Sequence, residues 1–437
     1  MSFSTKFYAT KVLKKLASLK LAISLLLIIG VVISIGTFIE QGQPLTFYKE
    51  NYSSLNPILG FIDWRFITQF KLDTIYTNFW FLAVLAFFGA SLLACTYTTQ
   101  IPSLKRFRLW EFMQKPERFQ NLQLRDYLPI NLSNTSLYHL RNDNYHVFRQ
   151  GKKNYAYSGL LGRVGPILVH FSILFVLIGS SAGTLSGYTV QEVVPRGEIF
   201  HLQNFIQYGK LTNIPKSGAW RVNDFWITYT NGFKVNQFYS DLSALDNQGS
   251  EIKRKTVFVN EPFVYKGISI YQTDWDILGV KVEINKNNNI QVPLKKINRS
   301  GQNFWIGSFS VGKFDLNKCT ILLNDLTGNI YLYNLKGELI SNTKLGQPTK
   351  HNLDQTLTFT EFITTTGLQI KEDPGLRIVY FSFALLIVSI YISFFSYSQV
   401  WGVEEGGKLL LGGKANRAVL AFQEEFKRVI KKIIRKS

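Results

Sequence analysis

The most prominent pattern in the chain is a set of four long apolar runs. They cover residues 21–39, 79–99, 164–183 and 376–400, and the only Asp, Glu, Lys or Arg among them is Arg377, at the edge of the fourth run. A membrane-spanning helix needs about 20 apolar residues, and core helices of soluble proteins rarely run so long without a charge. The sequence therefore predicts a membrane protein with four transmembrane α-helices.

The pattern changes between the third and fourth runs. Residues 184–375 alternate apolar and polar positions, as in Thr356-Leu-Thr-Phe, and Asn231-Gly232 and Lys336-Gly337 are typical turn pairs. This alternation predicts a large all-β-rich domain, sandwich or barrel-like, without fixing its topology. After the fourth run, Ala415–Ile434 has apolar residues at helical spacing and Lys or Arg on the other face. It predicts a basic amphipathic helix that lies on the inner membrane surface or docks on a partner.

The basic residues of the connecting segments predict the orientation. The formal charge is +5 for residues 1–20, +7 for 100–163 and +5 for 401–437, but only −1 for 40–78 and +3 for 184–375. By the positive-inside rule the N-terminus, the second loop and the tail face the cytoplasm or stroma, and the first loop and the β-rich domain are exported. Most of the net charge of +20 thus follows from topology, and no nucleic-acid partner is needed to explain it.

The cysteines exclude two classes of protein. The chain has two, Cys95 and Cys319, and no CxxC or CxxCH motif. It is therefore neither a thiol oxidoreductase nor a covalent c-type haem carrier by itself. Cys95 lies in the second apolar run, where a lone cysteine usually serves packing.

His170 is the one His, Asp, Glu, Lys or Arg in the interior of the four runs. It follows Arg163 by seven residues, which places it about 10 Å from the inner boundary at 1.5 Å per residue. An ionisable group at such a depth is a functional hypothesis by default. We predict a ligand of haem iron and keep a histidine bonded to a neighbouring helix carbonyl as the alternative. The neighbours expected to accommodate a porphyrin are Phe171, Phe175, Gly165, Gly179, Ser180, Ser181 and Gly183.

The histidine count limits this hypothesis. The other four histidines, His139, His146, His201 and His351, lie outside the apolar runs. His201 follows the third run closely and could approach a ligand near the membrane, although an ordinary surface histidine is the simpler interpretation. A membrane haem with two histidine ligands would therefore need its second ligand from another subunit or a second copy, and a diheme cytochrome b is excluded for the lone chain.

Several blocks of sequence resemble one family. They are LASLKLAISLLLIIGVVISIGTFIEQ (16–41), NFWFLAVLAFFGASLLACT (78–96), GRVGPILVHFSILFVLIGS (162–180), DFWITY (224–229), QFYSDLSALD (237–246), GISIYQTDW (267–275), GLQIKEDPG (367–375) and GGKANRAVLAF (412–422). In this order they resemble the ResB-like, or CcsB-like, membrane component of System II cytochrome c biogenesis, in its plastid and cyanobacterial form. The resemblance covers nearly the whole chain.

The resemblance implies a role in haem handling. Such proteins work with a CcsA-type partner that carries a tryptophan-rich haem-handling segment, and together they move haem across the membrane and attach it to apocytochrome c. His170 matches the family's transmembrane histidine, which implies one axial ligand of a transient b-type haem whose second ligand comes from the partner. The expected recipients are cytochrome f and soluble c-type cytochromes in the thylakoid lumen, and the expected location is a plastid or cyanobacterial thylakoid membrane. The chain would be a non-catalytic subunit of a haem lyase complex.

Two other functions stay open. A haem-free membrane scaffold or chaperone for the apocytochrome or its assembly complex would need the same helices and exported domain, with His170 used only for packing. A transporter of another solute would predict broken helices or paired polar groups at mid-membrane, and the apolar runs contain one histidine and no acid in their interior.

Overall fold

The chain forms two compact units. They are Met1–Ala182 with Gly375–Ser437, and Gly183–Pro374. The computed structural model describes residues 3–55, 57–107, 109, 111–215, 218–230, 235–285, 288–299, 302–310, 318–352 and 355–435. The first unit holds the long helices and a small α/β module, and the second is rich in strands.

The four long apolar helices that the sequence predicts are present. They are α2 (Leu19–Phe38), a continuous helical segment from Phe79 to Phe107, α8 (Gly165–Ser186) and α9 (Leu376–Ser393), and each is long and apolar enough to cross a membrane. The second consists of α5 (Phe79–Cys95), a π-helical turn (Thr96–Gln100) and α6 (Ile101–Phe107). The prediction of a membrane protein with four such helices is confirmed.

The fourth helix is shorter than the apolar run that predicted it. The run covers 376–400, but α9 ends at Ser393 and strand β20 begins at Ser398. Val400, Trp401 and Val403 of that strand are buried. A buried strand and a spanning helix both produce apolar runs, so periodicity alone does not separate them.

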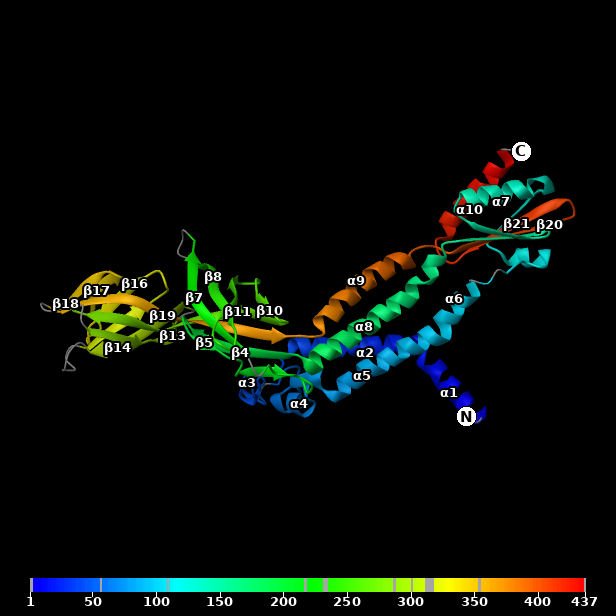
Figure 1. The fold of residues 1–437 in the computed structure, drawn as a ribbon. Helices are drawn as coiled ribbons and strands as arrows, with labels where there is room; N and C mark the ends of the chain where they lie inside the picture. Colours follow the sequence, from blue (N-terminus) through cyan, green and yellow to red (C-terminus); the bar gives the residue numbers. More distant parts are fainter. Residues whose placement is uncertain are drawn as a thin grey trace. The chain divides into compact units, whose positions relative to one another are not determined.

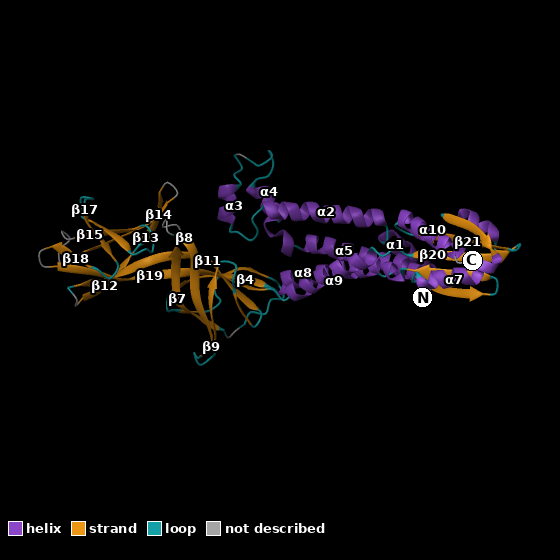
Figure 2. Ribbon diagram, turned by 90° about the horizontal axis from the view of Figure 1, so that it is seen from above, coloured by secondary structure: helices purple, strands orange, loops and turns teal. Residues whose placement is uncertain are grey.

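Small residues join α8 to α9, which run side by side in Figures 1 and 2. Gly165, Ser172 and Gly179 recur every seven residues on α8 and are buried, as are Ser382 and Ser389 on α9. A Cβ added to Gly165 would lie 2.3 Å from the Ser393 hydroxyl oxygen. Small side chains let helices approach closely where lipid offers no hydrophobic driving force between them.

The second helix contact in this unit joins α2, α5 and α8. Its buried core includes Leu25 and Ile29 of α2 and Phe88 and Leu92 of α5, with Leu174 of α8 packed against them. The loop after α2 is tied to the helix end by Gln41. Its amide nitrogen donates to the carbonyls of Ile39 and Leu72, at 2.7 and 2.9 Å.

Short helices complete the connections of this unit. They are α1 (Phe3–Leu16), α3 (Leu45–Asn51), α4 (Trp64–Gln69) and the 3₁₀ helices η1 (Leu72–Thr77), η3 (Pro116–Asn121), η4 (Ile130–Leu132) and η5 (Leu160–Arg163).

The second loop and the tail together form a small α/β module that the sequence did not predict. Its antiparallel sheet has the order β1-β21-β20-β3-β2. The elements are β1 (Leu124–Pro129), α7 (Ser133–Asn142), β2 (His146–Gln150), β3 (Lys153–Ser158), β20 (Ser398–Glu405), β21 (Lys408–Ala415) and α10 (Val419–Arg435). Because β3 pairs with β20, the loop between the second and third helices meets the segment after the fourth.

Helix α10 confirms the predicted basic amphipathic helix but not its docking surface. Its apolar side chains Phe422, Phe426, Val429, Ile430 and Ile433 are buried in a core shared with α7 and β21. The expectation that this face lies on the membrane or on a partner is wrong for these five residues. Their apolar area is covered by the module's own sheet, beside which α7 and α10 lie in Figure 1.

The second unit is the large β domain, and its strand-rich character confirms the prediction. One sheet has the order β10-β11-β19-β4-β6, with β12 on β11 and β18 on β19; the others are β13-β14-β15-β16-β17 and β5-β7-β8-β9. The strands, orange in Figure 2, are β4 (Tyr188–Pro195), β5 (Ile199–Phe200), β6 (Phe205–Tyr208), β7 (Ala219–Tyr229), β8 (Val235–Leu245), β9 (Glu251–Phe258), β10 (Phe263–Tyr265), β11 (Ile268–Ile284), β12 (Asn288–Pro293), β13 (Lys295–Arg299), β14 (Gln302–Ser310), β15 (Lys318–Leu323), β16 (Asn329–Tyr333), β17 (Leu339–Lys344), β18 (Pro348–Asn352) and β19 (Gln355–Glu372).

Two long strands give this domain two cores. Strands β11 and β19 pair over almost their whole length. Ile270 of β11 and Ile370 of β19 lie in one core, which also holds Trp220. Further along the same pair, Val280 belongs to the other core, with Trp305. The bulges in the pair, such as that between Gln272 and Asp274, interrupt the strict alternation that a sequence pattern relies on.

Candidate functional site

His170 lies in the second turn of α8 and contacts the end of the second span. Its Nδ1 lies 2.9 Å from the Thr96 hydroxyl oxygen, and its Nε2 lies 3.1 Å from the amide nitrogen of Gln100. The ring is half-buried. Both ring nitrogens therefore have side-chain partners from one short segment.

The proton count at Thr96 determines the tautomer of His170. The Thr96 hydroxyl oxygen lies 2.9 Å from the carbonyl oxygen of Leu92 and 2.9 Å from Nδ1 of His170. A hydroxyl has one proton and can donate to only one of them. Both contacts are hydrogen bonds only if the hydroxyl donates to Leu92 and Nδ1–H donates to the hydroxyl. The lone pair of the imidazole is then on Nε2.

Gln100 matches this tautomer. Its amide nitrogen is a donor, and the Nε2 lone pair that it faces is an acceptor. The amide oxygen of Gln100 is buried and has no hydrogen-bond partner among the described residues. The Gln100 side chain is therefore held at this position by one end only.

The backbone that carries both partners is a π-helical turn. It spans Thr96–Gln100, and the N–H of Ile101 donates to the carbonyl of Thr96. Such turns are rare and occur often at functional sites. The turn begins at Thr96 and ends at Gln100, and both side chains reach the same imidazole ring.

Two pairs among the seven expected porphyrin-contacting residues have different surroundings. Gly165 and Gly179 face α9, since a Cβ added to Gly179 would lie 2.9 Å from the Val379 side chain. The expectation that they allow a porphyrin to approach is therefore wrong for these two residues, which instead allow helix packing. Phe171 and Phe175 are both 38% exposed in the chain. Phe175 also packs against α9, since its ring centroid lies 6.4 Å from that of Phe381, and the rest of its surface stays exposed.

The arrangement fits one axial ligand of a haem. Metal-binding histidines almost always donate the proton of their other ring nitrogen to a fixed acceptor, and Thr96 supplies that acceptor here. Nε2 is the nitrogen that would bind iron, once Gln100 moves aside. In the described part of the chain, no group of three or more His, Cys, Asp or Glu side chains is placed so that it could hold a metal ion.

The other histidines lie outside the long helices. His139 is buried on α7, His146 is exposed on β2, and His351 belongs to β18. His201 is exposed in the large β domain, where its Nδ1 lies 2.9 Å from the Gly218 carbonyl. His201 is thus an exposed histidine with a backbone partner, which agrees with the simpler of the two interpretations of the sequence.

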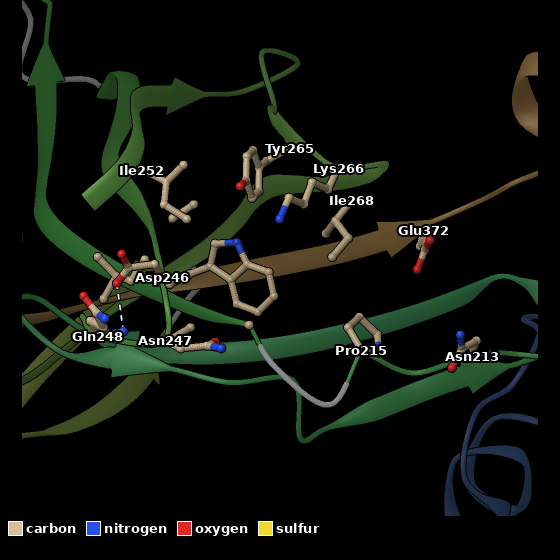
Figure 3. Close-up of a pocket in the computed structure, with 15 residues that line it drawn as sticks. Asn213, Pro215, Asp246, Asn247, Gln248, Ile252, Tyr265, Lys266, Ile268 and Glu372 are labelled. Atoms are coloured by element: carbon tan, nitrogen blue, oxygen red, sulfur yellow. Dashed lines mark hydrogen bonds between the residues drawn. The ribbon is translucent and has the colours of Figure 1, made fainter. Parts of the chain in front are cut away.

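A second concave region lies in the large β domain (Figure 3). Its volume is about 680 Å³, and Trp220 is one of its lining residues. In Figure 3, Asp246 lies on one side of it and Lys266 and Glu372 lie on the other. Its described lining residues include no histidine or cysteine. They offer neither an iron ligand nor a thiol, and His170 stays the candidate for haem chemistry.

Thr96 and Gln100 were not predicted from the sequence. One signal could have identified them. Thr96 and Gln100 are polar residues four positions apart at the end of the second apolar run, and the rest of that run has few side chains that can form a hydrogen bond with an imidazole. Which of the clustered Thr96, Thr98, Thr99 and Gln100 meets His170 depends on the π-helical turn, which no periodicity rule predicts.

Comparison with known proteins identifies the relatives of this chain. The ResB-like family model matches residues 19–312 and 320–427. The chain is 64% identical over 434 residues to a cytochrome c biogenesis protein Ccs1 from Emiliania huxleyi, covering 99% of each chain. It is 41% identical over 436 residues to a cytochrome c biogenesis protein CcsB from Trichormus variabilis, covering 99% of this chain and 94% of the relative. A Ccs1 protein from Thalassiosira pseudonana is 40% identical over 420 residues.

Proposed function

Because the chain belongs to the ResB-like family, we propose that it serves c-type cytochrome biogenesis as a membrane subunit that holds haem through His170. The matched relatives are named cytochrome c biogenesis proteins, and they cover nearly the whole chain. The observation that carries the haem assignment is the geometry of His170. Its Nδ1–H is fixed by Thr96, and its Nε2 lone pair faces a side chain that one hydrogen bond holds.

The haem is cargo that the chain shares with a partner. The described residues place one histidine on the four long helices, and a membrane haem held by two histidines needs a second. A CcsA-type membrane protein would supply that ligand. The transient b-type haem would then lie between the two proteins, against the exposed parts of Phe171 and Phe175.

The orientation follows from charge and connectivity. The N-terminus, second loop and tail are the most basic segments, and the loop and tail join in one sheet. We place this side in the stroma and the large β domain in the thylakoid lumen of a plastid or cyanobacterium. His170 lies near the stromal end of α8, so haem would meet it on entry.

The large β domain would receive the apocytochrome in the lumen, with cytochrome f and soluble c-type cytochromes as recipients. In the covalent step each thiol of the apocytochrome adds across a haem vinyl group: sulfur bonds one vinyl carbon and the hydrogen goes to the other. The addition needs reduced thiols and ferrous iron, and ligation of the iron by His170 and the partner favours the second condition. This chain is then a subunit of a haem lyase complex, and the thiols come from the apocytochrome.

A complementation experiment tests this function. The chromosomal copy is deleted in a photosynthetic host, and wild type, His170→Ala or His201→Ala is returned. Haem that stays on cytochrome f in a denaturing gel is then measured. We expect full recovery with wild type and with His201→Ala, and at least about a tenfold loss with His170→Ala, since an iron ligand is removed. Normal c-type cytochromes in the deletion strain would refute the function altogether.

One observation favours a second candidate, a haem-free scaffold for the apocytochrome or its assembly complex. Nε2 of His170 accepts a hydrogen bond from Gln100, and a permanent bond of this kind would make His170 a packing residue. Full recovery of cytochrome f by His170→Ala, together with loss in the deletion strain, would support the scaffold and contradict haem binding.

A further inference from the structure

The contacts of His170 point to two positioning residues. We propose that Thr96 fixes the tautomer that presents Nε2 of His170, and that Gln100 occupies this nitrogen until haem iron displaces it. The Gln100 part rests on the proposed haem function, whereas the Thr96 part concerns the imidazole ring alone.

The role of Thr96 follows from its two hydrogen bonds. Its hydroxyl is buried between the Leu92 carbonyl and Nδ1 of His170, at 2.9 Å from each. With the other tautomer, the single hydroxyl proton would face two acceptors, and one buried hydrogen bond would be lost. Thr96 therefore favours the tautomer with its proton on Nδ1, the one in which Nε2 can bind a metal.

The role of Gln100 follows from a difference between its two amide atoms, of which only the nitrogen has a hydrogen-bond partner among the described residues. The amide nitrogen donates to Nε2 of His170 at 3.1 Å, while the buried amide oxygen has no partner among the described residues. Without Gln100, the Nε2 lone pair would be left without a donor inside an apolar helix bundle, which is costly. With Gln100, Nε2 has a hydrogen-bond donor while no haem is bound, yet iron has to displace only this one hydrogen bond to reach it. Gln100 thus holds the ligand ready without blocking it.

The π-helical turn explains why one segment does both tasks. Thr96 and Gln100 stand at its first and last positions, and they meet opposite nitrogens of one ring. Thr98, between them, instead donates to the Ala94 carbonyl at 2.7 Å and does not contact His170. Thr98 therefore offers a control of the same residue type in the same turn.

The Thr96 part is tested without haem. The full-length chain is labelled with ¹⁵N-histidine in a membrane mimetic, and the ring signals of His170 are assigned by their loss in His170→Ala. We expect a protonated Nδ1 and an unprotonated Nε2 in wild type, Thr96→Ser and Thr98→Val. Thr96→Val should move the signals toward the other tautomer. The same tautomer in Thr96→Val as in wild type would overturn the role of Thr96.

The Gln100 part is tested by titrating haemin into the complex with the CcsA-type partner and recording the bound haem by its absorption. Thr96→Val should weaken binding about 10- to 100-fold, as the loss of a residue that orients a metal ligand typically does. Thr96→Ser should restore it, and Thr98→Val should equal wild type. Gln100→Leu should tighten binding about fivefold, since iron no longer competes with a hydrogen bond.

The outcomes separate the two proposals. If His170→Ala abolishes haemin binding but Thr96→Val and Gln100→Leu bind as wild type does, the positioning roles are wrong and the haem function stands. If His170→Ala binds haemin as wild type does, haem ligation by His170 is wrong, and with it the role of Gln100. The ring signals still decide the role of Thr96 in that case.

Discussion

At the scale of single residues, the candidate functional site consists of a few polar side chains in apolar surroundings. His170 is the clearest, because both of its nitrogens are engaged by side chains of one turn. The position of His170 in an apolar run was enough to predict it as a functional residue, since placing an ionisable group in a spanning helix costs free energy. The sequence did not predict Thr96 and Gln100, because a contact between two helices depends on their packing and not on any one pattern.

The thiol of Cys319 gives a residue-scale prediction. It lies on β15 and is fully buried in the large β domain. Burial raises the pKa of the Cys319 thiol to about 11. The thiol therefore stays protonated at pH 8, and thiolate becomes abundant only near and above that pKa. In a Cys95→Ser background we expect a maleimide to label the chain at pH 8 only after denaturation. Rapid labelling of the native protein would contradict this account and would leave Cys319 able to exchange with apocytochrome thiols.

At the scale of elements, close approach between backbone segments explains why glycine occupies positions that the hydrophobic pattern does not single out. The segment before α8 packs on the end of α9, where a Cβ added to Gly162 would lie 1.8 Å from the Phe395 carbonyl oxygen. By contrast, nothing lies within 4 Å of a Cβ added to Gly30 in α2. The helices themselves were predictable from apolar length, but their contacts were not.

This contrast gives a matched pair of variants. Gly162→Ala should lower the free energy of unfolding by about 1–3 kcal/mol, because the backbone at Phe395, just after α9, would have to shift. Gly30→Ala should leave it unchanged or raise it slightly, since Ala favours a helix. Thermal unfolding of the two purified variants in the same detergent measures the difference. Equal midpoints for Gly162→Ala and wild type would show that the two segments do not pack as described.

Helix α10 gives a second element-scale prediction. Phe426 is 7% exposed in the core of the small α/β module, whereas Leu420 on the same helix is 78% exposed. Phe426→Asp should destabilise the module by at least about 3 kcal/mol, because it removes a buried aromatic ring and introduces a charge. Leu420→Asp should change stability by less than about 0.5 kcal/mol.

Limited proteolysis of the tail in membranes measures this prediction. Rapid cleavage is expected for Phe426→Asp and slow cleavage for Leu420→Asp. If Leu420→Asp instead released the tail and Phe426→Asp did not, α10 would dock through its other face.

At the scale of the whole molecule, some parts of the fold could be predicted from the sequence and others could not. The four long helices and the strand-rich character of Gly183–Pro374 were predictable, because apolar length and alternation are local signals. The small α/β module was not, because its strands are short and pair across the chain, as Leu124 does with Gly413. The two cores of the large β domain also depend on pairing between β11 and β19, which lie far apart in sequence.

Connectivity gives a prediction about the two sides of the membrane. An epitope tag at the Gly249 turn in the large β domain should be protected from protease in sealed vesicles that expose the face proposed to be stromal. A tag after Ser437 should be digested in the same vesicles. Gly249 has a φ of +85° in an exposed turn, so an insertion there disturbs no sheet contact. Cleavage of both tags in sealed vesicles would contradict the proposed topology, and detergent, which opens the vesicles, provides the control.

Whether His170 holds haem can be decided by one absorption spectrum. The chain is purified with the proposed CcsA-type partner, and the reduced-minus-oxidised absorption spectrum is recorded for wild type, His201→Ala and His170→Ala. We expect a b-type haem signal in the first two, its loss in His170→Ala, and its return when imidazole is added to replace the missing ligand. An unchanged spectrum in His170→Ala would contradict the claim and leave the chain as a scaffold whose partner alone holds the haem.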